Sequence, residues 1–244
     1  MMYRKGELSA TMIDRDWPHQ VALPAYRCLG HNYLTAPAMS IDPLKRSVKL
    51  MAIALVMRLC RAFDRTPSEA NEAAYMRLLT PAIKYWVCKT APPFLYEAME
   101  CLGGNGYVEE GILARHYRES PVNAIWEGSG NVMCLDVLRA LSREADAALA
   151  VLRELAEETQ GLAGAGEAVA FIGKAFRRPD SERVARVAVE RLALLAAAAA
   201  LNKVAPRSAE LFAATRFATN HTGMYGAVDL ANDDVRALLE RALP

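Results

Sequence analysis

The stretch from Cys101 to Arg139 reads CLGGNGYVEEGILARHYRESPVNAIWEGSGNVMCLDVLR and carries the most informative pattern in the chain. It contains two glycine-rich turns, Gly103-Gly104-Asn105-Gly106 and Gly128-Ser129-Gly130, and each lies at a predicted helix boundary. Glycine lets the backbone approach a ligand closely, and free N–H groups at the start of a helix attract phosphates and oxyanions. The two turns therefore predict a ligand-binding surface built largely from backbone.

One carboxylate, Glu127, lies between the two turns and directly follows Trp126. Partial desolvation beside an aromatic ring makes a carboxylate a better base near neutral pH, so Glu127 is a candidate general base. Each piece also has a plainer interpretation. Leu102-Gly103-Gly104 could end a helix, Glu127 could be a solvated loop residue, and Gly128-Ser129-Gly130 could cap the next helix.

The combination is more specific than its parts. A GGNGY turn, a short basic helix and the sequence PVNAIWEGSGN before an apolar helix resemble the C-terminal helical domain of the acyl-CoA dehydrogenase flavoproteins. The resemblance is strongest to the AidB-like subgroup, which is linked to the adaptive response to alkylation stress. It extends from about Arg46 to the C-terminus and is most specific between Glu97 and Leu141.

The resemblance implies roles for individual residues. Glu127 would be the base that takes the α-proton from an acyl-CoA thioester, and Trp126 would form a wall of the pocket. The glycine turn would lie against the ADP part of FAD, usually the FAD of a neighbouring subunit, because family members are homo-oligomers and commonly tetramers. The implied FAD contacts are Gly103, Gly104, Gly106, Trp126, Ser129 and Asn131.

The implied reaction oxidises a CH–CH bond. Glu127 would remove the α-proton while a hydride leaves the β-carbon for N5 of the flavin. The backbone N–H of the base and a ribityl hydroxyl of FAD would hold the thioester oxygen. Fixed donors of this kind commonly supply a large part of an enzyme's rate enhancement.

Residues 1–45 do not fit the family pattern. Family members carry an N-terminal helical domain and a β-barrel domain before the final bundle, and those domains supply much of the acyl pocket. This segment instead contains Pro18, Pro24, Pro37 and Pro43 and shows no sustained helical or strand period. An Arg-containing phenylalanine-glycine stretch that usually opens the C-terminal domain is also missing. We therefore expect a truncated or misjoined family member, and the sequence leaves open whether it is active alone.

The remaining residues predict an all-α fold: an acyl-CoA dehydrogenase C-terminal-type four-helix bundle with an additional C-terminal helical region. An apolar stripe from Val48 to Phe63 predicts a first helix that ends near Asp64. Pro81 is expected to begin a separate helix, because proline suits the first turn, and Pro92 and Pro93 to kink it. The other predicted helices follow at 69–79, 81–102, 129–141, 145–158, 167–177, 181–204, 208–221 and 233–242.

The glycine-rich segment 161–166 is the clearest internal boundary. It divides the chain into an unassigned segment at 1–45, a family-like bundle at 46–160 and an additional helical region at 167–244.

Composition limits the class of protein. The chain has 244 residues, 53% of them hydrophobic, and a net charge of +1, which gives no global reason for binding nucleic acid or an acidic membrane. The longest apolar run, Leu192–Leu201, is far shorter than the roughly 20 residues of a membrane span, and no signal peptide is evident. Five scattered cysteines without a CxxC pair suggest buried thiols in a reducing compartment, and hence a cytoplasmic protein: Cys28, Cys60, Cys88, Cys101 and Cys134.

A local cluster of cations lies between residues 171 and 216, which hold nine Lys and Arg against four Asp and Glu. Solvated helix faces are the plainer interpretation, but such clusters can also bind phosphates without reading sequence. The AidB-like subgroup links this region to double-stranded DNA, which is therefore a possible partner. The candidate contacts are Arg139, Arg177, Arg178, Arg183 and Arg186.

Other reactive residues suggest no further site. The four histidines have no partner spacing typical of a metal or a catalytic triad, so no metal is expected. Glu109 and Glu110 follow the first glycine turn and are expected to cap the next helix.

Three hypotheses remain open from the sequence. The first is an FAD-dependent acyl-CoA dehydrogenase of the AidB-like subgroup. The second is a DNA-associated alkylation-response protein with a vestigial flavin site, and the third is a catalytically silent helical fragment.

Overall fold

The computed structural model describes residues 43–217 and 231–242, and these residues form helices and 3-10 turns with no β-strand. The predicted all-α class is therefore confirmed. The unassigned segment at 1–45 lies outside the described residues, except that its last three residues begin the first described helix.

The first described helix, α3 (Pro43–Arg65), packs against α4 (Ala70–Glu100), and these two carry much of the core. Ala52, Leu55 and Leu59 form the buried stripe of α3, at the spacing that the sequence predicts. The helix ends within one residue of the expected Asp64, and Ser68 N–H donates to the carbonyl of Arg65 in the turn that follows.

The predicted break at Thr80-Pro81 is wrong, because α4 runs through Pro81, Pro92 and Pro93 as one helix. A proline inside a helix costs about 3 kcal/mol, since it removes a hydrogen bond and crowds the preceding turn. Burial on both sides of Pro81 outweighs that cost: Leu79 and Ala82 are fully buried in the core. The Thr80 hydroxyl also donates to the Met76 carbonyl at 2.7 Å, which satisfies an acceptor beside the break.

Two helices after the glycine turns match their prediction closely. The helix α7 (Gly130–Arg143) packs along α4, and α8 (Ala145–Glu158) follows after a single residue. The bounds of α8 are those that its alanine, leucine and glutamate content predicts.

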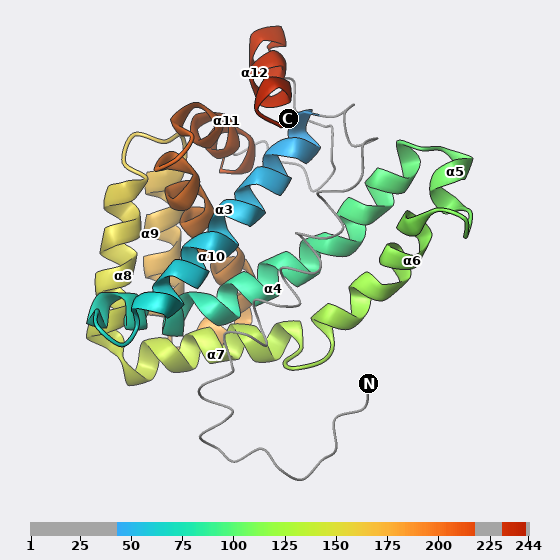
Figure 1. Cartoon of the computed structure of the whole chain (residues 1–244). Helices are drawn as coiled ribbons and strands as arrows, with labels where there is room; N and C mark the ends of the chain where they lie inside the picture. The colour runs from blue at the N-terminus through green and yellow to red at the C-terminus, as the bar shows by residue number, and fades with distance from the viewer. Residues whose placement is uncertain (1–42, 218–230, 243–244) are drawn as a thin grey trace.

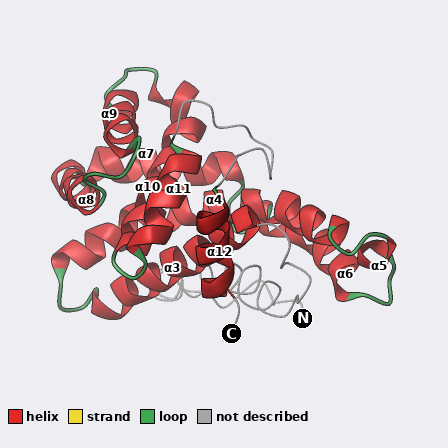
Figure 2. Cartoon of the chain, turned by 90° about the horizontal axis from the view of Figure 1, so that it is seen from above, coloured by secondary structure: helices red, strands yellow, loops and turns green. Residues whose placement is uncertain are grey.

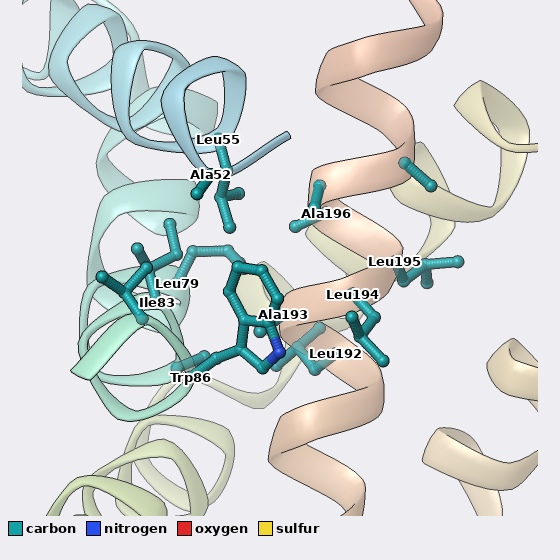
Figure 3. Close-up of a cluster of buried hydrophobic side chains, with 14 of the residues drawn as sticks. Ala52, Leu55, Leu79, Ile83, Trp86, Leu192, Ala193, Leu194, Leu195 and Ala196 are labelled. Atoms are coloured by element: carbon teal, nitrogen blue, oxygen red, sulfur yellow. The ribbon is translucent and has the colours of Figure 1, made fainter. Parts of the chain in front are cut away.

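The alanine-rich helix α10 (Ala185–Asn202) lies in the centre of the molecule and contacts α3, α4, α7, α8 and α9. Its run Leu192–Leu201 is buried on every side. Figure 3 shows how its small side chains let α3 and α4 approach: Ala193 and Ala196 face Leu55 and Trp86. One hydrophobic core thus extends across the glycine segment 161–166, and the proposed division of the chain at that segment stays a prediction.

The remaining elements cover this core. They are α9 (Ala165–Phe176), the 3-10 turn η4 (Ser181–Val184), α11 (Pro206–Arg216) and α12 (Asn232–Ala242). The predicted helix 181–204 begins instead as a 3-10 turn. The predicted helix 208–221 starts two residues earlier, with Pro206 in its first turn, and its expected end at His221 lies outside the described residues.

An arm of short elements leaves the bundle between α4 and α7. It consists of α5 (Gly104–Tyr107), α6 (Ile112–Glu119) and the 3-10 turn η3 (Ser120–Ala124), and all three contact α4. Figures 1 and 2 place α5 and α6 at one end of the molecule and α8 and α9 at the other. The arm carries both glycine turns that the sequence singles out.

Three further predictions can be compared with the described residues. Cys88 and Cys134 are buried free thiols as expected, Cys60 and Cys101 are only partly buried, and Cys28 lies outside the described residues. Within the described ranges, no group of His, Cys, Asp and Glu could hold a metal ion. No helix of that part of the chain is long and apolar enough to cross a membrane.

Candidate active site

The turn that carries Glu127 joins η3 to α7 and has an unusual backbone. Glu127 has a φ of 53°, which makes it the one non-glycine residue with positive φ in the described parts of the chain, and Gly128 follows at 109°. A left-handed conformation costs a residue with a side chain about 1–2 kcal/mol. Such strain persists only where the surroundings impose it, and it often marks a functional site.

A buried lysine imposes this conformation. Lys84, in the middle of α4, is 1% exposed, and its Nζ donates to the carbonyl oxygens of Trp126 at 2.8 Å, Glu127 at 2.9 Å and Gly128 at 2.7 Å. An ammonium has three N–H donors, so all three are used. Burial lowers the pKa of Lys84, while its electrostatic interactions with Cys88 and Glu127 oppose that shift. Sequence reasoning missed this residue, although a single lysine inside the apolar run from Leu78 to Val87 was a usable signal.

The backbone beneath the turn is closely packed. A Cβ on Gly128 would lie 2.3 Å from Cε of Met133, and a Cβ on Gly130 would lie 2.9 Å from Cε of Lys89. Both distances are below a normal carbon–carbon contact. The φ of 109° requires a glycine at position 128, whereas at position 130 the end of the Lys89 side chain would have to move to admit a Cβ.

The side chains of the turn face outward. Glu127, Ser129 and Asn131 are exposed, and Trp126 is 52% exposed, so the expected shielding of the carboxylate by the indole ring is not found among the described residues. Ser129 occupies the N-cap position of α7 without a side-chain hydrogen bond. The described residues also provide no acceptor for the backbone N–H of Glu127. An exposed carboxylate thus lies beside an unused donor.

The first glycine turn uses its three glycines for different reasons. Gly103 has a φ of 57° and Gly104 begins α5, and a Cβ on either would meet no atom within 4 Å. Gly106 is buried, and its Cβ would lie 2.2 Å from the carbonyl oxygen of Met99. Packing inside the chain explains Gly106 and backbone geometry explains Gly103, but neither accounts for Gly104.

The structure does not bring the two turns together. Helix α6 and η3 lie between them, and α6 alone spans about 12 Å at 1.5 Å per residue. Figure 1 shows α5 at the end of α6 that is far from the start of α7. The residues predicted to contact FAD therefore form two separate groups, one at each glycine turn.

Beside the first turn, an open hollow is lined by apolar and charged side chains, among them Met99, Tyr107, Glu109 and Arg118. Tyr107 is 76% exposed, and Ile112 and Ile125 are exposed as well. Arg118 donates to both carboxylate oxygens of Glu109, which holds the pKa of Glu109 below its ordinary value. The predicted capping of α6 by Glu109 and Glu110 is wrong: Gly111 holds the N-cap position, and the first turn contains no acidic residue.

Some of the arginines that were predicted to contact DNA form ion pairs or a ring contact within the chain. Arg178 donates to both oxygens of Asp180 at 2.8 and 2.9 Å, Arg139 pairs with Asp136 at 3.0 Å, and Arg186 lies 5.9 Å above the ring of Tyr85. Arg177 and Arg183 are exposed, although Arg183 lies 4.0 Å from Asp180.

Comparison with known proteins agrees with the geometry. Residues 45–142 match the family model described as "Acyl-CoA dehydrogenase, C-terminal domain". AidB of Escherichia coli (strain K12), a relative named as an acyl-CoA dehydrogenase, is 61% identical over 92 residues, which cover 38% of this chain and 17% of AidB. The chain thus matches less than a fifth of that relative's length.

Two solved structures share the fold. Caenorhabditis elegans ACDH-11, solved in complex with C11-CoA, superposes with a TM-score of 0.59 at 26% identity over 68% of this chain and 33% of its own. An acyl-CoA dehydrogenase from Bacillus anthracis, solved with FAD, gives a TM-score of 0.54 at 14% identity over 92% of this chain and 45% of its own. At that identity the second match speaks for the fold alone. Residues 45–142 of this chain are therefore similar to the C-terminal domain of the acyl-CoA dehydrogenase family.

Proposed function

We propose that this protein is an FAD-dependent oxidoreductase of the acyl-CoA dehydrogenase type, in which Glu127 removes the α-proton of an acyl-CoA thioester. The observation that carries the proposal is the Glu127 turn: an exposed carboxylate on a left-handed backbone that a buried ammonium holds in place. The family match and the C11-CoA complex of the C. elegans protein support the class of substrate.

The residues of the turn suit two steps. The Glu127 carboxylate accepts the α-proton, and the unused N–H of the same residue donates to the thioester oxygen as negative charge develops there. Because the donor and the base belong to one residue, fixing the backbone fixes both. FAD, when bound, supplies the acceptor for the β-hydride.

The first glycine turn fits a contact with that cofactor. Gly104 is exposed with open space around it, and nothing within the described chain requires a glycine there. A ligand that approaches the backbone closely would require one. We propose that Gly103 and Gly104 face FAD, that Trp126, Ser129 and Asn131 face its flavin side, and that Gly106 shapes the turn. The exposed apolar surface around Ile112 fits a homo-oligomer in which a second copy covers the arm.

The test is α-proton exchange. Purified protein with added FAD should exchange the α-proton of an acyl-CoA with deuterium from solvent, measured by mass spectrometry. Glu127→Gln should slow the exchange by about 10²–10⁴-fold, since the change removes the general base at nearly constant shape. Glu110→Gln, an exposed carboxylate on the same arm, is the matched control and should exchange at the parent rate. An unchanged rate in Glu127→Gln, or no exchange in the parent, would contradict the proposal.

Double-stranded DNA is a second proposed partner. The favouring observation is that η4 contacts α7, α9 and α10, which gathers exposed Arg177, Arg183 and Arg186 at one corner. Replacing Arg177, Arg178, Arg183 and Arg186 with glutamine should lower the slope of log affinity against log salt by about 0.9 for each lost phosphate contact. Arg153→Gln on α8 is the control. The same slope in the parent and in the fourfold variant would show that these arginines form only a solvated face.

A further inference from the structure

Lys84 occupies an environment that normally excludes a lysine. Its side chain is 1% exposed among fully buried neighbours such as Ile83 and Val87, whereas Lys89 on the same helix is exposed. Burying an ammonium is unfavourable unless hydrogen bonds replace its water. Three carbonyl oxygens at 2.7–2.9 Å provide that replacement.

The three acceptors belong to consecutive residues, and Glu127 is the middle one. Successive carbonyls do not converge on one point in an extended or right-handed backbone. The positive φ angles of Glu127 and Gly128 turn all three toward the interior. The ammonium and the left-handed turn therefore depend on each other. The three carbonyl oxygens replace the water that the buried ammonium has lost, and the ammonium stabilises the strained backbone of the turn.

The same arrangement sets the direction of the Glu127 side chain. With three consecutive carbonyls held from below, the Cα of Glu127 is fixed and its carboxylate stays exposed above the turn. Reacting groups must lie within a few tenths of an ångström of their productive geometry, and a displacement of 1 Å can cost about 10²-fold in rate.

We propose that Lys84 is a positioning residue, whose ammonium fixes the Trp126–Gly128 turn and thereby sets where the Glu127 carboxylate and the Glu127 N–H meet the substrate. The proposal rests on the proposed function of Glu127. Lys84 itself lies beneath the backbone and acts through it.

The first test measures the turn without any substrate. A glutamate-specific protease cleaves after Glu127 only when the turn opens, and the rate of cleavage follows the population of the open form. Lys84→Met removes the donors at similar length and should raise the cleavage rate about tenfold. Lys174→Met, at an exposed lysine on α9 away from the turn, is the control and should leave the rate unchanged. Equal rates in the parent and Lys84→Met would overturn the proposal.

The second test asks whether Lys84 compensates for the strain at position 127. Glu127→Gln keeps a side chain on the left-handed backbone, whereas Glu127→Gly removes the strain. Lys84→Met should lower the midpoint of urea unfolding more in the Gln background than in the Gly background. The same drop in both backgrounds would show that Lys84 serves only general packing. If Lys84→Met does not fold, Lys84→Gln replaces it, because glutamine keeps two N–H donors on a shorter side chain. The same changes in cleavage rate and urea midpoint are then expected, but smaller.

The third test separates positioning from binding. In the α-proton exchange assay, Lys84→Met should lower kcat by about 10²-fold and leave KM within about twofold, because the base is displaced while the acyl-CoA surface is kept. A parent protein without exchange would contradict the function proposed for Glu127, while the protease and unfolding tests would still decide whether Lys84 holds the turn. A rise in KM at constant kcat would overturn the positioning role.

Discussion

The two glycine turns of the arm are constrained in opposite ways. The turn at residues 126–130 is fixed from inside the molecule by Lys84 and by close contacts behind Gly128 and Gly130. At the turn of residues 103–104, the same kind of sequence has open space around it. The chain itself requires Gly128, whereas no atom within it requires Gly104, which is proposed to contact FAD. The comparison therefore separates the turn of the proposed base from the turn of the proposed cofactor contact.

The largest contrast should appear in thiol reactivity. Cys88 lies near Gly128 and Gly130 of the fixed turn, Cys134 lies on α7, and burial raises the pKa of each thiol to about 11. Their thiolate fraction at pH 8 is on the order of 10⁻³, and only the thiolate reacts. Cys101, partly exposed beside the open turn, should be labelled by iodoacetamide well before Cys88 and Cys134, as followed by peptide mass spectrometry.

The pH dependence of the labelling rate tests whether the raised pKa is the cause of slow labelling. Because the raised pKa keeps both buried thiols protonated, their labelling should accelerate about tenfold per pH unit until the pH nears 11. Fast labelling of Cys88 at pH 8 would mean that the fixed turn opens readily, and the contrast between the turns would be lost.

Substitution of Gly128 should have the next largest effect. Gly128→Ala places a Cβ at a φ of 109° and 2.3 Å from Met133, and we expect a loss of about 1–3 kcal/mol in the free energy of unfolding. Chemical denaturation measures it. Gly166→Ala on α9, where a Cβ meets open space, is the matched control and should not destabilise the protein.

Substitutions in the open turn should have the smallest effect on folding. Gly104→Ala should be neutral or stabilise by up to about 1 kcal/mol, because it has space and a helical backbone. Gly103→Ala should cost about 1–2 kcal/mol through its φ of 57° alone. If the open turn meets FAD, Gly104→Ala should nevertheless weaken retention of added FAD, as measured by fluorescence titration. Unchanged FAD retention would place the contact elsewhere.

The sequence predicted what depends on local chemistry. Alanine and leucine content predicts the limits of α8 to the residue, and glycines mark the turns at 103–104 and 128–130. The continuous helix α4 could not be predicted, because burial of Pro81 overrides a local rule. Lys84 could not be paired with its turn, since its three acceptors are backbone atoms 42–44 residues away and carry no side-chain signature. The positive φ of Glu127 could not be predicted either, because it depends on the same long-range contact with Lys84.

The central position of α10 bears on the autonomy of the family-like part. The residues that match the family end at 142, yet α10, from residue 185 onward, packs against α3, α4 and α7 inside that same core. A polypeptide that stopped at the glycine segment would uncover Leu55 and Trp86, which lie toward Ala196 and Ala193 of α10 in Figure 3. The recognisable sequence and the foldable unit are therefore different stretches of chain. The alanine-rich helix α10 carries no sequence motif, yet it completes the hydrophobic core of α3, α4 and α7.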